Sequence, residues 1–145
     1  MFAKILYPTD FSDVATKALE YIKKLKDSGA KEVIVLHVID ERGGDALYRL
    51  LGENEFQSYK KTRQEETENL LKGVAQELTK AGLKVRIRLE AGIPVREILR
   101  VEKEEGSSVV VIGSHGVSNL QEIFLGSVSE KVIRKSKNPV FVVKR

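Results

Sequence analysis

The stretch Val109-Val110-Val111-Ile112-Gly113-Ser114-His115-Gly116 decides the fold of this chain. Its four apolar residues are typical of a short strand buried on both faces, as central strands of a parallel sheet are. Gly113 and Gly116 then end the strand, and Gly126-Ser127 follows ten residues later and opens a helix. A strand, a glycine-rich turn and a helix start, in this order, predict an α/β sheet with a site beyond the end of the strand.

Strand and helix patterns alternate along the rest of the chain, which predicts one doubly wound α/β domain over residues 1–145, with a parallel sheet and helices on both faces (Rossmann-like). The expected strands are Ala3–Tyr7, Val33–Ile39, Leu83–Glu90, Val109–Ile112 and Pro139–Val143. Helices are expected to begin at Ser12 or Asp13, at Glu53, at Pro94 and at Gly126. The polar segment Asp40–Gly52 is expected to be a loop with at most one helical turn, and Asp40–Phe56 to be a mobile lid.

Strand character predicts the sheet order 3-2-1-4-5. The third strand alternates, with Lys84, Arg86 and Arg88 on one face, which suits an edge position because charges discourage pairing with other chains. In this order strands one and four are neighbours whose connections leave in opposite directions, so a ligand is expected beyond their carboxyl ends. Tyr7–Asp10 and Gly113–Gly116 should therefore meet there.

The glycines after the fourth strand favour an anion site. Glycine lets the backbone approach a ligand closely, and exposed N–H groups at a helix start attract negative charge. Ser127 adds a hydroxyl donor. The alternative is that these glycines serve only turns and that Ser127 with Glu130 forms a helix capping box; a capped helix start can still face a phosphate.

Composition excludes several classes of function. The chain has no cysteine, which rules out disulfides and thiolate chemistry, and no apolar run long enough to span a membrane. Its net charge of +4 arises from interleaved acids and bases, as in Lys60–Glu66, which favours solvated helix surface over a nucleic-acid-binding face. A cytoplasmic protein without membrane or nucleic-acid partners is expected.

Several segments together resemble the universal stress protein family, in its ATP-binding branch. The glycine pattern of that branch matches Gly113-Ser-His-Gly116, nine residues, then Gly126-Ser127, and further matches are Lys4–Ser12, Val35–Asp40, Gly92–Pro94 and Asn138–Val143. The resemblance covers nearly the whole chain and is weakest over about 41–70. It implies ATP, or AMP or ADP, as the ligand, with Mg²⁺ or Mn²⁺ bridging the phosphates.

The resemblance also implies roles for matched positions. Phosphates and ribose would be held by Gly113, Gly116, Gly126, Ser127 and Val128, largely through backbone N–H groups. Asp10, beside Thr9, would face the ribose, whose hydroxyls can donate to a carboxylate. The backbone of Val38 would read the adenine edge, with Pro8 and Ile112 flanking the base. Val117 departs from the family, where a basic residue is frequent, which predicts weaker phosphate binding.

Two functions of different class remain open. The first is a nucleotide-dependent regulatory module of the stress response, acting on an unknown protein partner. The second is a slow ATP hydrolase or nucleotide transferase using the same site. His37 is expected in the core and His115 in the phosphate loop, where it could assist hydrolysis. No pair of residues stands out as nucleophile and base, so no catalytic residue and no protein-held metal is assigned, and the regulatory module is favoured.

The last strand predicts a homodimer. Val140–Val143 is apolar on both faces although the sheet order places it at an edge, where unpaired backbone groups invite association. A two-fold axis would pair the strand with its own copy, and the family resemblance implies the same contact. The alternative is that the chain's own long helix covers this strand.

Overall fold

A parallel sheet forms the centre of the protein in the computed structural model, which describes residues 1–115 and 125–145. The strands are β1 (Lys4–Pro8), β2 (Glu32–Asp40), β3 (Lys84–Gly92), β4 (Val109–Gly113) and β5 (Val140–Val143). The helices are α1 (Asp13–Leu25), the short 3-10 helix η1 (Lys26–Ser28), α2 (Gly44–Leu51), α3 (Glu53–Lys80), α4 (Pro94–Glu105) and α5 (Ser127–Lys135). The sheet order is β3-β2-β1-β4-β5 and all pairs are parallel, which confirms the predicted fold class.

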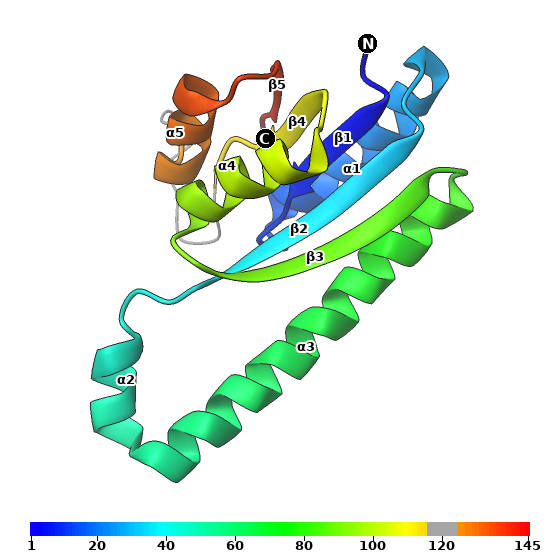
Figure 1. The fold of residues 1–145 in the computed structure, drawn as a ribbon. Helices are drawn as coiled ribbons and strands as arrows, with labels where there is room; N and C mark the ends of the chain where they lie inside the picture. The colour runs from blue at the N-terminus through cyan, green and yellow to red at the C-terminus, as the bar shows by residue number, and fades with distance from the viewer. Residues whose placement is uncertain (116–124) are drawn as a thin grey trace.

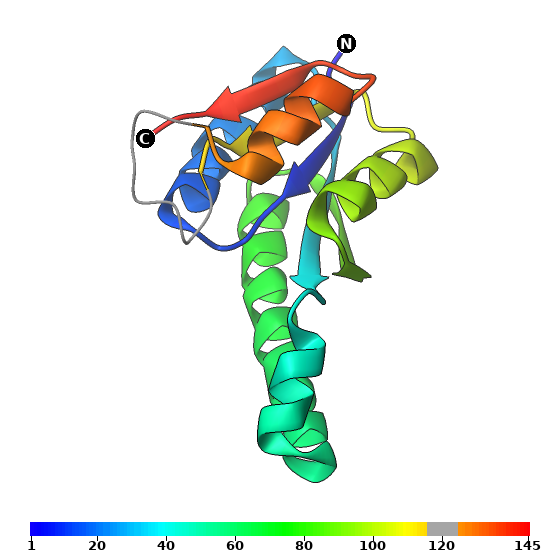
Figure 2. The ribbon, with the colours of Figure 1, turned by 90° about the vertical axis from the view of Figure 1, so that its left-hand side faces the viewer.

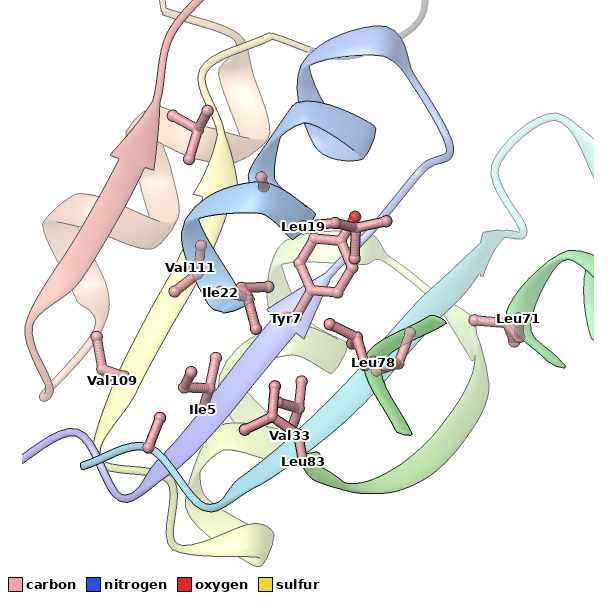
Figure 3. Packing of buried hydrophobic residues seen from close by; sticks show 14 residues of the cluster. Ile5, Tyr7, Leu19, Ile22, Val33, Leu71, Leu78, Leu83, Val109 and Val111 are labelled. Atoms are coloured by element: carbon pink, nitrogen blue, oxygen red, sulfur yellow. The ribbon is translucent and has the colours of Figure 1, made fainter. Parts of the chain in front are cut away.

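Alternating side chains of the central strands build a core on each face of the sheet. Ile5, Tyr7 and Val33 point to one face, where they pack with Leu19 and Ile22 of α1 and with the second half of α3 (Figure 3). Leu6, Ile34 and Ile112 point to the other face, against Ile98 of α4 and Val132 of α5. Helices therefore cover both faces of the sheet, α1 and α3 on one and α4 and α5 on the other (Figure 1).

The segment after β2 is more helical than its composition predicts. The expectation of a loop over Asp40–Gly52 is wrong for α2, which has two turns and buries none of its residues. Tyr48 of α2 packs edge-on against Phe56 of α3, with ring centroids 5.4 Å apart, and this local contact stabilises the pair of helices. Together α2 and the first half of α3 form an arm that extends away from the sheet (Figures 1 and 2).

The edge strand β3 is held by ion pairs as well as by its hydrogen bonds to β2. Arg88 reaches Glu90, Glu104 and Glu105, and Arg86 contacts Glu32 and Glu105. Two of the three charges predicted to guard this edge, Arg86 and Arg88, thus join β3 to α4 and β2. Among the described residues, no helix is long and apolar enough to cross a membrane.

Candidate functional site

One cavity of about 1000 Å³ lies at the carboxyl ends of β1, β2 and β4. This is the topological switch point, where parallel sheets leave a crevice for ligands. Nine of the ten residues assigned from the sequence line it: Pro8, Thr9, Asp10, Val38, Ile112, Gly113, Gly126, Ser127 and Val128. The tenth, Gly116, lies outside the described residues, as does Val117. The volume is of the size that small-molecule sites occupy.

The loop after β1 is fixed by its own hydrogen bonds. Thr9 N donates to Leu36 O at 2.8 Å, and the Thr9 hydroxyl accepts from Phe11 N at 3.0 Å. Asp10 Oδ1 accepts from Ser12 N, and Ser12 Oγ in turn caps α1 at Ala15 N. Phe11 has φ +63°, a conformation uncommon outside glycine, which these contacts hold in place. The carboxylate of Asp10 is therefore carried on a rigid loop at the cavity wall.

The end of β2 leaves backbone groups open to the cavity. Pairing with β1 stops at Pro8↔Leu36, while β2 continues to Asp40. Leu36 O faces β1, and backbone direction alternates along a strand, so the N–H and C=O of Val38 face the same side, beyond the end of β1. A donor and an acceptor thus stand side by side on the cavity wall.

His37, the residue between Leu36 and Val38, is half-buried rather than a core residue. Its Nδ1 lies 2.7 Å from Thr9 O, and its ring packs on Phe11 at 5.0 Å. Burial lowers the pKa of His37 below its ordinary value; the Thr9 carbonyl and Asp10 oppose this shift and Arg63 adds to it. His37 lines the cavity beside the loop after β1.

Two glycines flank the turn after β4, Gly113 at the end of the strand and Gly126 at the start of α5, and their surroundings differ. A Cβ on Gly113 would lie 3.1 Å from Val14 Cγ1 and 3.2 Å from Ala15 N, so this glycine admits the close approach of α1. Gly126 has φ −61° and is the N-cap of α5, and its N–H donates to Ser114 O at 2.7 Å. Backbone strain does not require glycine at 126, and this residue lines the cavity.

The start of α5 differs from the capping box that the sequence suggested. Gly126 is the N-cap, without a side-chain cap, and Ser127 is the first helical residue, so the proposed Ser127–Glu130 box is wrong. Ser129 Oγ donates instead to Gly113 O at 2.6 Å and ties α5 to β4. The exposed Ser127 side chain lines the cavity, where its hydroxyl can reach a ligand.

His115 presents a buried nitrogen at the cavity. The side chain is only 7% exposed, and its Nδ1 lies 2.7 Å from Ser114 Oγ. Its Nε2 has no hydrogen-bond partner within residues 1–115 and 125–145. A buried polar atom without a partner is costly, so a ligand that bonds to this nitrogen would be stabilised.

Several lining residues escaped the sequence reasoning. The interleaved charges of Lys60–Glu66 predict solvated helix surface, yet Arg63 in this segment lines the cavity together with Arg42 from the loop after β2. Pro94 and Ile98 of α4 complete the apolar wall. No local signal marks Arg63 or Ile98, because only the packing of α3 and α4 on the sheet brings them to the strand ends. Asp40 pairs with Arg42 at 2.6 Å, and this contact lowers the pKa of the carboxyl group.

No group of three or more metal-ligating side chains occurs within the described ranges.

Comparison with known proteins agrees with this architecture. Residues 1–144 match the model of the universal stress protein family. Universal stress protein MJ0577 of Methanocaldococcus jannaschii is 46% identical in sequence, and the alignment covers 100% of this chain and 96% of that protein. The solved structure of MJ0577 superposes with a TM-score of 0.87 at 45% identity, covering 100% of this chain and 97% of that one.

Two further solved structures show the same fold. That of hypothetical protein PH0823 has a TM-score of 0.81 at 38% identity, covering 100% of this chain and 97% of that one. A universal stress protein of Archaeoglobus fulgidus in complex with dAMP has a TM-score of 0.66 at 22% identity, covering 99% and 98%. The family match over nearly the whole length and the high identity to MJ0577 lead to one conclusion: the chain belongs to the universal stress protein family.

Proposed function

We propose that this protein binds an adenine nucleotide, with ATP as the first candidate, and acts as a nucleotide-dependent regulatory module. The observation that carries the proposal is the convergence of three strand ends and the start of α5 on one cavity of about 1000 Å³. Membership of the family agrees with it, and one relative of the same fold is solved with dAMP.

The chemistry of the cavity suits the parts of such a ligand. Adenine has a hydrogen-bond acceptor beside an amino donor on one edge, which complements the adjacent N–H and C=O of Val38. Pro8, Ile98 and Ile112 offer apolar surface for the flat base. Asp10 can accept from ribose hydroxyls, and Ser127 with the first N–H groups of α5 can hold phosphate. Mg²⁺ or Mn²⁺ would bridge the phosphate oxygens.

Calorimetry with ATP and Mg²⁺ tests the site. Gly126→Val should weaken binding at least about tenfold, because a branched side chain would stand where phosphate approaches the backbone. Its φ of −61° is open to any residue, so the substitution adds no backbone strain. Gly73→Val is the matched control, since a Cβ there meets nothing within 4 Å. Equal affinity of wild type and Gly126→Val would refute the assignment.

The hydrolase alternative makes a different prediction for His115, whose buried Nε2 could position a water molecule or contact a phosphate. Steady-state phosphate release from ATP measures it. Under the regulatory proposal, turnover stays negligible in the wild type while His115→Gln weakens ATP binding. Robust turnover that His115→Gln or Asp10→Asn abolishes would favour the enzyme instead.

A further inference from the structure

A second pocket, of about 230 Å³, lies beside the nucleotide cavity, between the start of α4 and the flank of α5. Ile93–Arg96 forms one wall, and Ser127, Lys131 and Lys135 form the other. These three residues are four apart on α5, so they lie on one ridge of the helix. Arg42 reaches the pocket from the loop after β2, and no acidic residue among those described lines it.

Three of the four positive charges of this pocket are not balanced by nearby carboxylates; the fourth, Arg42, pairs with Asp40. Arg96, Lys131 and Lys135 make no ion pair with any residue in the described ranges, whereas the other arginine of α4, Arg100, and the arginine of α5, Arg134, both do. The closest acids along these helices are already engaged: Glu97 pairs with Arg100, and Glu130 pairs with Arg134. Cations gathered around one small pocket repel one another, and a bound polyanion would relieve this repulsion.

We propose that the pocket lined by Arg96, Lys131 and Lys135 binds phosphate, as a group carrying at least two negative charges. A single carboxylate would neutralise one of the cations, whereas a pyrophosphate-like group can meet several at once, and the planar fork of Arg96 suits phosphate oxygens. Arg42 is already paired with Asp40, so we assign it only a supporting role at the rim of the pocket.

The pocket is continuous with the nucleotide cavity. Arg42, Pro94, Ser127 and Val128 line both. Phosphates that begin at Ser127 can therefore continue along the α5 ridge towards Lys131. The phosphate has two possible sources with the same chemistry: free inorganic pyrophosphate, or the outer phosphates of a nucleotide seated in the cavity. Only the second source rests on the function proposed above.

Titration of the isotopically labelled protein with sodium pyrophosphate, followed by amide chemical shifts at constant ionic strength, tests the proposal. We expect the amides of Val95, Arg96 and Lys131 to shift. The triple variant Arg96→Gln/Lys131→Gln/Lys135→Gln should bind about tenfold more weakly, the loss expected for three exposed charge contacts. Lys131→Arg/Lys135→Arg should retain binding and shows that charge, rather than lysine, is required.

A control of equal charge is Lys31→Gln/Lys61→Gln/Lys80→Gln, three exposed lysines outside α4 and α5. If both triple variants weaken binding equally, the effect is general attraction and the pocket is not a site. Shifts confined to Asp10 and Ile112 would place pyrophosphate in the nucleotide cavity alone and would also overturn the proposal.

Comparing ATP with adenosine 5′-tetraphosphate separates the two sources. Tighter binding of the tetraphosphate by wild type, lost in the first triple variant, identifies the outer phosphates of a nucleotide. If both nucleotides bind equally and pyrophosphate still shifts the Arg96 amide resonance in the presence of ATP, the ligand of this pocket is the free anion. Pyrophosphate binding here by a protein that fails to bind ATP would uphold this pocket and reject the proposed function.

Discussion

His37 is a titratable side chain whose environment is set by its neighbours rather than by its strand. Partial burial against Phe11 disfavours the imidazolium form, and the contact of Nδ1 with Thr9 O holds the ring in place. The pKa of His37 is accordingly lower than in an unfolded chain. This residue therefore links the protonation state of the cavity wall to the stability of the fold.

The free energy of unfolding should fall as the solution is acidified through the ordinary histidine range. Because the folded pKa of His37 is lowered, the unfolded state binds more protons there, and stability present above about pH 6.5 is lost progressively below it. Urea unfolding at several pH values measures the slope. His37→Asn, which keeps a donor for Thr9 O, should flatten it; an unchanged slope in the variant would contradict this account.

At the scale of elements, α3 is one helix with two environments. From Thr67 onward it buries Leu71 and Leu78 against the sheet, whereas its first half has no buried residue and, with α2, forms the arm. Helical backbone hydrogen bonds hold both halves, but only the second half is also protected by tertiary packing.

The rate of amide hydrogen exchange should differ between the exposed first half of α3 and its packed second half. Amides of α2 and of Glu53–Glu66 should exchange rapidly in the empty protein, and those around Leu71 and Leu78 should approach the protection of the central strands. With ATP bound, slower exchange over Asp40–Gly43 would support the lid that we predict for Asp40–Phe56, because Asp40 and Arg42 line the cavity. Strong protection of α2 without ligand would exclude a mobile lid.

At the scale of the whole molecule, the two edges of the sheet are unlike. The edge at β3 carries an ion-pair network that joins it to α4, in which Glu105 contacts Lys4, Arg86 and Arg88. At the other edge, β5 pairs with β4 alone among the described strands, and Phe141 is 39% exposed. An apolar strand with one open edge is a surface for association.

The predicted homodimer would pair β5 with its own copy across a two-fold axis. The carbonyls of Pro139 and Val143 face β4, so the N–H of Val142 faces the open edge. Val142→Pro removes that donor and should give monomers in sedimentation at concentrations where wild type dimerises. Val142→Ala keeps the donor and controls for the partly buried side chain, so it should remain dimeric. A monomeric wild type at high micromolar concentration would refute the interface.

Local pattern determined the order of elements, the sheet order and most of the candidate site, since buried strands, glycine turns and helix starts are recorded residue by residue in Val109–Gly116 and Gly126–Ser127. Tertiary structure alone decided the rest. The helix α2 is an exception, because its contact between Tyr48 and Phe56 is local, yet the polar composition of Asp40–Gly52 did not indicate it. Arg63 and Arg96 line the two pockets because whole helices pack against the sheet. Position 113 is a glycine because α1 approaches it too closely for a Cβ atom. Contacts between residues distant in sequence depend on how helices dock, and no local pattern encodes that geometry.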